Sequence, residues 1–222
     1  MTPKYKRILL KLSGETLGGE EGSGFDYETI ISLAENVIAV HNLDVEVGIV
    51  IGGGNIFRGS KPTAGNIGRV AGDHMGMLAT VINSICLQEM LEQRGVLTRV
   101  LSAIELNAIA EPYIKRRADR HLKKKRVVIF AAGTGNPYFT TDTAAVLRAS
   151  EVGAEIVIKA TKTNGVYDKD PLTHSDAVRY VQLNYDEVLN KNLQVMDATA
   201  IAFCRDNKLP IMVLDYREPD TI

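Results

Sequence analysis

The sequence has 222 residues, of which 45% are hydrophobic and 24% are charged, and its formal net charge is −1. Its length and composition suit a soluble globular protein with one large α/β domain or two small ones, and the charge argues against bulk nucleic acid as the main partner. Residues 1–7 are polar and no apolar run has membrane-spanning length, so we expect a cytoplasmic protein without a signal peptide or membrane span.

Short apolar runs rich in valine and isoleucine alternate with stretches of helical periodicity along the chain. Nearly continuous hydrophobicity is typical of strands that are buried on both faces of a sheet. We therefore predict strands at residues 8–12, 45–51, 96–101, 127–132, 156–158 and 211–214.

The intervening stretches carry helix start and stop signals. Strand–helix alternation of this kind indicates a mostly parallel central sheet sandwiched between helix layers. Because no linker or internal repeat interrupts the pattern, we expect residues 1–222 to form a single domain. The predicted helices are one that Asp26 caps, one from about Asp73 to Arg94, one from Thr141 or Asp142 to about Gly153, and one that Asp197 caps before Pro210.

The remaining composition signals are weak. The two cysteines form no CxxC pair and the four histidines show no ligand spacing. A reducing compartment fits the cysteines, and the histidines argue against a transition metal held by protein side chains. Residues 115–126 read KRRADRHLKKKR, which we interpret as a solvated helix and turn rather than a nucleic-acid site, because charge runs usually only solvate.

Glycine, serine, threonine and lysine gather where predicted strands end. Carboxyl ends of parallel strands lie along one edge of a sheet, so these groups should converge on one ligand site. Glycines let backbone N–H groups approach phosphate oxygens, helix N-termini add partial positive charge, and lysines and arginines add full charges. The segments are Lys11 to Gly14, Gly52 to Arg58, Gly133 to Pro137 and Lys159 to Thr161.

The pattern therefore predicts a polyphosphate site. Asp142 and Asp73 lie near helix starts at this edge, where a carboxylate can orient a lysine, contact a ribose hydroxyl or hold Mg²⁺ through water. Each residue alone also has a simpler reading, such as a solvent-exposed lysine, a tight glycine turn or a helix cap. Their joint occurrence favours the phosphate site. The P-loop, dinucleotide GxGxxG and GxSxG spacings are all absent.

Five motifs resemble those of a known family and occur in the same order along the chain. They are KLSGE (11–15), GGGNIFRG (52–59), GDHMGMLAT (72–80), GTGNPYFTTD (133–142) and KATKTNGVYDKDP (159–171). From about Lys6 to Pro210 the sequence resembles bacterial uridylate kinases, a branch of the amino-acid-kinase family. GGGNIFRG together with GTGNPYFTTD separates this branch from the aspartate, glutamate and carbamate kinases.

The resemblance implies an amino-acid-kinase fold and transfer of the γ-phosphoryl group of ATP to UMP, which gives UDP and ADP in pyrimidine nucleotide biosynthesis. It implies Mg²⁺ arriving with ATP, and a homohexamer that GTP activates and UTP inhibits. Family members usually continue past the last strand into a short Gly-Thr strand, whereas this sequence ends at Ile222. Either a tail is missing or the last sheet edge is shorter.

The resemblance also gives roles to individual positions. Those matching the ATP site are Lys11, Leu12, Ser13, Gly14, Gly54 and Arg58 at the phosphates and Thr161, Tyr167 and Asp170 at the nucleoside. Those matching the UMP site are Gly53, Asp73, Thr134, Gly135, Asn136, Pro137, Tyr138, Phe139, Thr140 and Thr141. The segment tied to GTP activation corresponds to Gly19, Glu20, Glu21, Gly22, Ser23 and Gly24.

Charge neutralisation should dominate the chemistry. The second pKa of a phosphate monoester is about 6, so the acceptor is mostly dianionic at neutral pH and needs no general base. We assign Lys11 and Lys159 to the transferring phosphoryl group, Arg58 to bracing phosphate oxygens and Asp142 to orienting the lysines. One alternative is a kinase for a carboxylate or carbamate acceptor, which GTGNPYFTTD disfavours. Another is a non-catalytic nucleotide sensor, which the joint presence of Lys11, Lys159 and Asp142 disfavours because pure binding does not need all three.

Overall fold

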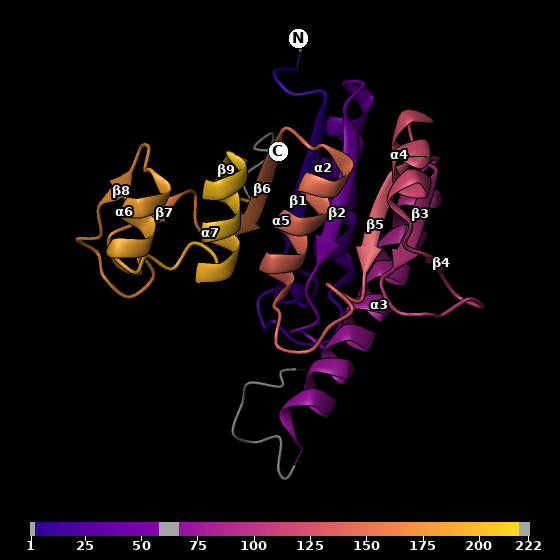
Figure 1. Cartoon of the computed structure of the whole chain (residues 1–222), viewed down its shortest axis with the longest axis horizontal. Helices are drawn as coiled ribbons and strands as arrows, with labels where there is room; N and C mark the ends of the chain where they lie inside the picture. The colour runs from indigo at the N-terminus through magenta and orange to yellow at the C-terminus, as the bar shows by residue number, and fades with distance from the viewer. Residues whose placement is uncertain (1–2, 58–66, 218–222) are drawn as a thin grey trace.

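A computed structural model describes residues 3–57 and 67–217, and its centre is a seven-stranded sheet (Figure 1). All neighbouring strands in this sheet are parallel, which confirms the predicted parallel architecture. The order across the sheet is β4 (Glu111–Pro112), β3 (Thr98–Ser102), β5 (Val127–Ala131), β2 (Glu46–Ile51), β1 (Arg7–Leu12), β6 (Ile156–Thr161) and β9 (Ile211–Asp215).

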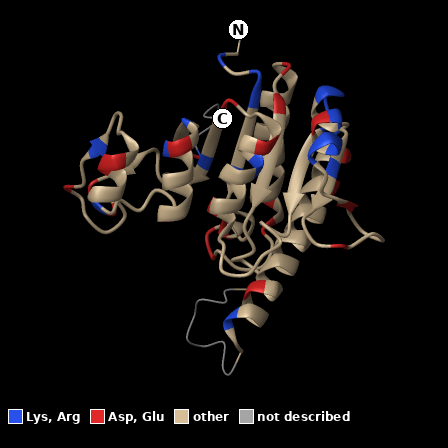
Figure 2. Ribbon diagram, viewed as in Figure 1, with Lys and Arg blue, Asp and Glu red and all other residues tan. Residues whose placement is uncertain are grey.

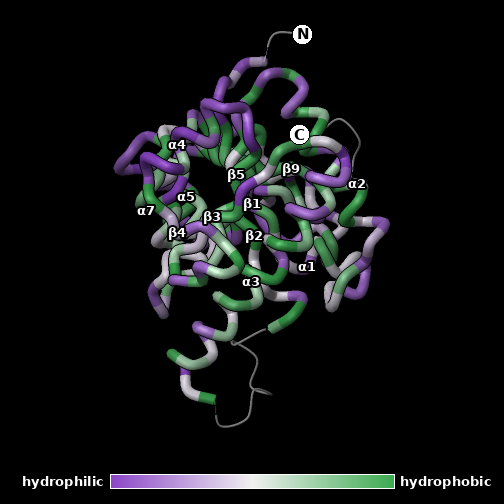
Figure 3. Tube along the Cα trace, turned by 90° about the vertical axis from the view of Figure 1, so that its right-hand side faces the viewer, coloured by the Kyte–Doolittle hydropathy of each residue, from purple (hydrophilic) through white to green (hydrophobic). Residues whose placement is uncertain are grey.

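Helices cover both faces of this sheet, because successive side chains of each strand point to opposite faces and both sets are apolar. One core cluster lies under α2 (Tyr27–Asn42) and α3 (Arg69–Glu92). The other lies under α4 (Lys115–Lys123), α5 (Thr141–Val152) and α7 (Ala198–Asn207). The hydropathy colouring in Figure 3 shows green strands at the centre of the molecule.

Helix ends follow the predicted signals with one exception. The Asp26 side chain accepts a hydrogen bond from the backbone N–H of Thr29 at 2.8 Å, and Gly153 ends α5 in a left-handed conformation with φ of +69°. The predicted start of α3 near Asp73 is wrong. The helix begins at Arg69 without a side-chain cap, so Asp73 lies inside it.

Short elements without a strong sequence pattern complete the chain. They are α1 (Gly14–Leu17), α6 (Tyr185–Asn190) and an antiparallel pair formed by β7 (Val166–Tyr167) and β8 (Arg179–Tyr180). β7, β8 and α6 lie together at one side of the molecule, beyond α7 (Figure 1). Two-residue strands carry no readable alternation, which explains why the sequence did not predict them.

The basic run forms α4 and the turn after it, and Figure 2 shows lysine and arginine gathered on this helix. Several of these side chains pair with carboxylates: Lys123 Nζ lies 2.8 Å from Asp119, and Lys125 Nζ lies 2.7 Å from Asp44. Such contacts neutralise part of the positive charge on this surface.

The helix α3 extends past the edge of the sheet (Figure 1). By length and composition alone, this helix could cross a membrane, contrary to our expectation that no run has that length. Core helices of soluble proteins meet the same criterion, and the buried side chains of α3, including Met77, Leu87 and Leu91, pack into the core cluster shared with α2. Its other side chains include exposed apolar groups, among them Leu78 and Ile82.

The loop after β2 approaches α3 so closely at Gly53 that this position has no room for a side chain. A Cβ atom there would lie 2.7 Å from Ala79 Cβ and 2.9 Å from the carbonyl oxygen of Gly76. Gly53→Ala must push the loop away from the helix, and we expect it to lower the free energy of unfolding by about 1–3 kcal/mol in urea denaturation.

Gly76→Ala is the matched control. Its Cβ meets no atom within 4 Å, and we expect it to stabilise α3 by up to about 1 kcal/mol. Equal stability of Gly53→Ala and the wild type would contradict the close approach.

Candidate active site

The ends of β1 and β6 place two lysines side by side. The parallel register pairs Lys11 with Lys159, so both side chains leave the same face of the sheet. Leu9 and Val157, two residues earlier on the same strands, pack in the core cluster under α5 and α7. Because side chains alternate along a strand, both lysines also point toward this helix layer.

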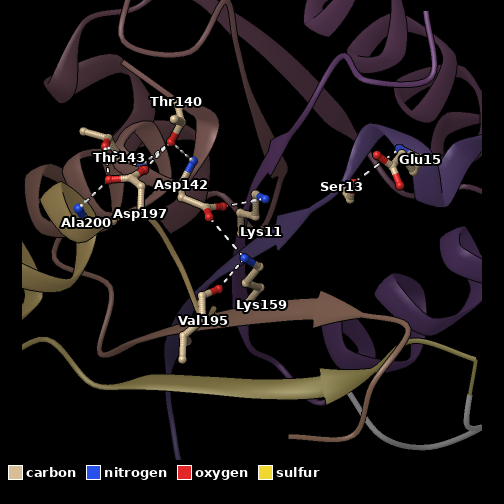
Figure 4. Close-up of polar contacts among 10 residues, drawn as sticks. All are labelled: Lys11, Ser13, Glu15, Thr140, Asp142, Thr143, Lys159, Val195, Asp197 and Ala200. Atoms are coloured by element: carbon tan, nitrogen blue, oxygen red, sulfur yellow. Dashed lines mark hydrogen bonds and ion pairs between the residues drawn. The ribbon is translucent and has the colours of Figure 1, made fainter. Parts of the chain in front are cut away.

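Asp142, in the first turn of α5, lies between the two ammonium groups (Figure 4). Its Oδ1 is 2.5 Å from Lys11 Nζ and its Oδ2 is 3.1 Å from Lys159 Nζ. The three side chains are largely buried, with exposed fractions of 13% for Asp142, 9% for Lys11 and 17% for Lys159. One carboxylate therefore holds two like charges together.

Lys11, Asp142 and Lys159 form a triad of charged groups, and the pKa values of Asp142 and Lys159 show that its charges do not balance. Burial alone raises the pKa of Asp142, but the charges of Lys11 and Lys159 outweigh it, so the pKa lies below its ordinary value. The pKa of Lys159 is lowered, chiefly because burial disfavours its ammonium form, and Asp142 offsets only part of this effect. Three buried charges sum to one net positive charge, which suits an anionic ligand.

A short segment before α7 holds this arrangement in place. Asp197 accepts hydrogen bonds from the Thr140 hydroxyl, from the Thr143 hydroxyl at 3.1 Å and from the backbone N–H of Ala200 at 2.9 Å. Two residues earlier, the carbonyl oxygen of Val195 accepts a hydrogen bond from Lys159 Nζ (Figure 4). Residues 195–197 thus fix both the lysine and the helix start that carries Asp142.

A first cavity of about 540 Å³ opens beside the lysines. It is lined by five residues expected at the ATP site, namely Lys11, Ser13, Thr161, Tyr167 and Asp170, and by Lys159, which was expected at the transferring phosphoryl group. Leu12 and Gly14 do not line it. Leu12 is fully buried, and a Cβ at Gly14 would lie 2.5 Å from the Gly54 nitrogen, so both could meet a ligand only through the backbone.

A second cavity, of about 410 Å³, adjoins the first. Glu15 lines both cavities, which places them side by side. Gly54 was expected at the ATP phosphates, but it lines this second cavity together with residues expected at UMP. Those residues are Gly53, Asp73, Thr134, Asn136, Phe139, Thr140 and Thr141.

The other residues expected at UMP shape the loop between β5 and α5. Gly135 and Pro137 do not line the second cavity, nor does Tyr138. Gly135 has φ of +81°, and a Cβ there would lie 3.0 Å from the Ala103 carbonyl oxygen, so the turn requires glycine. The ring of Tyr138 is exposed, and the Arg69 guanidinium lies 5.5 Å from its centroid.

Asp73 ties this loop to α3. Its Oδ2 accepts a hydrogen bond from the backbone N–H of Tyr138 at 2.7 Å and forms an ion pair with Arg69 at 2.8 Å. Burial alone raises the pKa of Asp73, but these two partners outweigh it, and the pKa lies below its ordinary value. Asp73 is therefore a charged side chain at the wall of the second cavity.

Residues 19–24, the segment matched to GTP activation, contact the loop after β2 and the chain at the end of β6. The Gly24 carbonyl oxygen accepts a hydrogen bond from Asn55 Nδ2 at 2.7 Å, and the Gly19 carbonyl oxygen accepts one from Lys162 Nζ at 3.3 Å. The segment therefore joins the loop after β2 to the end of β6. Arg58, expected to brace phosphate oxygens, lies outside the described residues.

The sequence did not indicate two residues of this site. Asp197 has the signature of an ordinary helix cap, and its bonds to Thr140 and Thr143 depend on how α7 packs against α5. Glu15 belongs to the motif KLSGE, but no sequence pattern indicates that it lies between two cavities.

Comparison with known proteins places the chain in a family. A model of the amino acid kinase family matches residues 6–215. The chain belongs to this amino acid kinase family. A uridylate kinase from Cereibacter sphaeroides is 57% identical over 215 residues, which cover 97% of this chain and 87% of that protein.

Solved structures of UMP kinases agree with the fold. A UMP kinase from Bacillus anthracis has a TM-score of 0.94 and 40% identity, and the match covers 98% of this chain and 90% of that one. A UMP kinase from Ureaplasma parvum has a TM-score of 0.91 and 38% identity over 98% of this chain and 92% of that one. The predicted family and fold are confirmed.

The charge balance of the triad yields a stability prediction for Asp142→Asn. Removing one partner of a buried ion pair typically costs 3–5 kcal/mol, and here two ammonium groups lose their common carboxylate, so we expect a loss of about 3 kcal/mol at pH 7 in urea denaturation. The folded-state pKa of Asp142 lies below the unfolded value, so its stabilising contribution is complete above about pH 4 and is lost as pH falls through the folded pKa. The difference in free energy of unfolding between Asp142→Asn and the wild type should therefore shrink as the pH falls below about 4.

Asp186→Asn is the control, because Asp186 is an exposed partner of Arg205 at 3.2 Å. We expect it to change the free energy of unfolding by less than about 1 kcal/mol. A loss for Asp142→Asn no larger than that of the control would show that the carboxylate does not hold the lysines together.

Proposed function

We propose that this protein is a UMP kinase, which transfers the γ-phosphoryl group of ATP to UMP and gives UDP and ADP in pyrimidine nucleotide biosynthesis. The observation that carries the proposal is the pair of adjoining cavities with two lysines and Asp142 beside them. The relatives that bear the names uridylate kinase and UMP kinase support the identity of the acceptor. We take residues 1–222 as one catalytic domain.

ATP would occupy the first cavity, with its nucleoside among Thr161, Tyr167 and Asp170 and its phosphates directed at Lys11 and Lys159. The support for this direction is electrostatic. Lys159 is a cation that burial destabilises, and an adjacent phosphate would restore its preference for the charged form. Arg58 would brace phosphate oxygens from the chain that follows the loop after β2.

UMP would occupy the second cavity, between Asp73 on α3 and the loop before α5. Thr140 caps α5 and Thr141 begins it, so the acceptor phosphate would meet the N-terminal end of a helix. Asp73 would accept hydrogen bonds from the ribose or base. Gly133, Thr134, Asn136 and Phe139 would then enclose the rest of the nucleotide.

The transfer needs no general base in this arrangement. A UMP phosphate oxygen attacks the γ-phosphorus of ATP, the bond from that phosphorus to the β,γ-bridging oxygen breaks, and the bridging oxygen leaves with ADP. Lys11 and Lys159 stabilise the charge on the transferring group, and Asp142 keeps the two ammonium groups together. No proton moves, because the acceptor is mostly dianionic at neutral pH, with a second pKa of about 6.

We propose that Mg²⁺ accompanies ATP, where it would neutralise phosphate charge. Within residues 3–57 and 67–217, no group of three or more histidine, cysteine or acidic side chains is placed to hold a metal ion. Asp142 is engaged by two lysines. These residues fit an ion whose ligands are mainly phosphate oxygens and water.

We further propose a cytoplasmic homo-oligomer, and specifically a hexamer, that GTP activates and UTP inhibits. The exposed apolar side chains of α3, including Leu78, Ile82 and Ile85, would be covered by another subunit. Residues 19–24 contact the loop after β2 and the end of β6, which is where a GTP-dependent shift would reach the site.

A coupled assay of ADP release tests the proposed function. We expect turnover with UMP, much weaker turnover with CMP, and none with aspartate, glutamate or carbamate. Lys11→Ala should depress kcat by on the order of 10²-fold or more, because it loses charge stabilisation in the transition state. Turnover with a carboxylate or carbamate in place of UMP would favour the kinase alternative, and nucleotide binding without turnover would favour a sensor.

Asp73→Asn separates the two cavities kinetically. We expect it to raise the KM for UMP by roughly ten-fold and to leave the KM for ATP within about two-fold, because Asp73 lines only the second of the two cavities. Initial rates with each substrate varied at saturating levels of the other give both constants. An effect confined to ATP would contradict the placement of UMP.

A further inference from the structure

The loop that lines the second cavity begins with a strained turn. Ala132 and Gly133, directly after β5, have φ values of +63° and +59°. The left-handed region costs a residue with a side chain roughly 1–2 kcal/mol, so Ala132 keeps this conformation only if its neighbours enforce it. The turn sets the direction in which residues 134–141 leave the sheet.

A buried hydroxyl holds the first residue of the turn from one side. The backbone N–H of Ala132 donates a hydrogen bond to Thr80 Oγ1 at 2.8 Å, and that hydroxyl donates to the Met77 carbonyl oxygen at 2.7 Å. Thr80 is only 3% exposed and belongs to α3. The Thr80 hydroxyl accepts one hydrogen bond and donates another, and it thereby ties the turn to α3, the helix that carries Asp73.

A buried arginine holds the second residue from the other side. Arg148 on α5 is 5% exposed, and its Nη2 lies 3.5 Å from the Gly133 carbonyl oxygen, the long end of hydrogen-bond range. Its Nη1 lies 2.6 Å from Glu151 Oε2. Arg148 lines neither the first nor the second cavity.

Tyr113 locks the arginine in this orientation. The guanidinium carbon lies 3.9 Å from the Tyr113 ring centroid, and the Tyr113 hydroxyl donates a hydrogen bond to the same Glu151 oxygen at 2.6 Å. Burial and the nearby Glu151 carboxylate raise the pKa of Tyr113, so its hydroxyl remains a donor. The stack, the ion pair and the shared carboxylate leave the planar guanidinium little freedom to turn.

We infer that Arg148, supported by Tyr113 and Glu151, is a positioning residue for the acceptor-binding loop, and that Thr80 holds the opposite side of the same turn. Arg148 acts through Gly133 on residues 134–141 without touching the acceptor itself. This inference rests on the proposed function for the identity of the acceptor, UMP. The placement of the loop by Arg148 is independent of which acceptor is used.

The test compares Arg148→Met with Arg148→Lys and with Arg205→Met, an exposed arginine on α7 that pairs with Asp186 and Asp206. We expect Arg148→Met to raise the KM for UMP by roughly ten-fold while the KM for ATP stays within about two-fold, because a small misplacement of the loop weakens the acceptor site alone. Arg148→Lys keeps the charge but lacks the planar fork, so its effect should be intermediate. Arg205→Met should leave both constants unchanged.

Hydrogen exchange supplies a readout that does not depend on the acceptor. In Arg148→Met the amides of residues 134–141 should exchange faster, while those of α7 keep the wild-type rate. A purely structural role would lower the melting temperature and move both KM values together or neither, and either pattern overturns the inference. Failure of the wild type to phosphorylate UMP would sink the proposed function, and the exchange result would still decide the role of Arg148.

Tyr113→Phe covers the case in which Arg148→Met does not fold. It removes one hydroxyl and keeps the aromatic ring under the guanidinium. We expect a rise of about two- to three-fold in the KM for UMP with little change for ATP. Wild-type constants for both substrates in this variant, with unchanged exchange of residues 134–141, would overturn the inference.

Discussion

The site depends on the parallel register between β1 and β6, which places Lys11 beside Lys159 on one face of the sheet. Two adjacent ammonium groups in a largely buried position repel each other, and the fold must compensate them. It does so with one carboxylate, Asp142, at 2.5 and 3.1 Å from the two nitrogen atoms. The N-terminus of α5 therefore has to lie over these two strand ends.

Much of the surrounding structure serves that placement. Asp197 binds the hydroxyls of Thr140 and Thr143 in the first turn of α5, and its neighbour Val195 binds Lys159 through a carbonyl oxygen. Asp197 also caps α7, so the packing of α7 on α5 and the alignment of the charged groups depend on the same residues. A change in how these helices pack would move Asp142 relative to both lysines, which links stability of the helix layer to geometry of the site.

The sequence predicted the features that depend on local pattern. Continuous apolar runs gave the central strands, and Asp26 and Gly153 marked helix ends correctly because capping is a local interaction. The start of α3 was missed because Gly68 gives no side-chain cap, and Asp73 was mistaken for the start. The hydrogen bonds from Thr140 to Asp197 and from Arg148 to Gly133 join residues 57 and 15 positions apart, so no periodicity or spacing could reveal them.

The placement of Gly54 shows a further limit of motif reading. Motifs locate residues along the chain, whereas the division between the two cavities depends on which side of a loop each residue faces. The loops that carry Gly14 and Gly54 approach closely, since a Cβ at Gly14 would lie 2.5 Å from the Gly54 nitrogen, yet Gly54 lines the second cavity while Ser13 lines the first. Positions that the sequence had grouped together therefore line different cavities.

The lowered pKa of Lys159 gives the triad a direction of response. Burial disfavours the Lys159 ammonium, Lys11 adds repulsion, and Asp142 restores only part of the lost stability. A full compensation by protein carboxylates would leave no net attraction for an anion, and a missing Asp142 would drive the lysines apart. One carboxylate shared by two lysines lies between these extremes: it keeps the cations in register and leaves a positive charge that a phosphate group in the first cavity can neutralise.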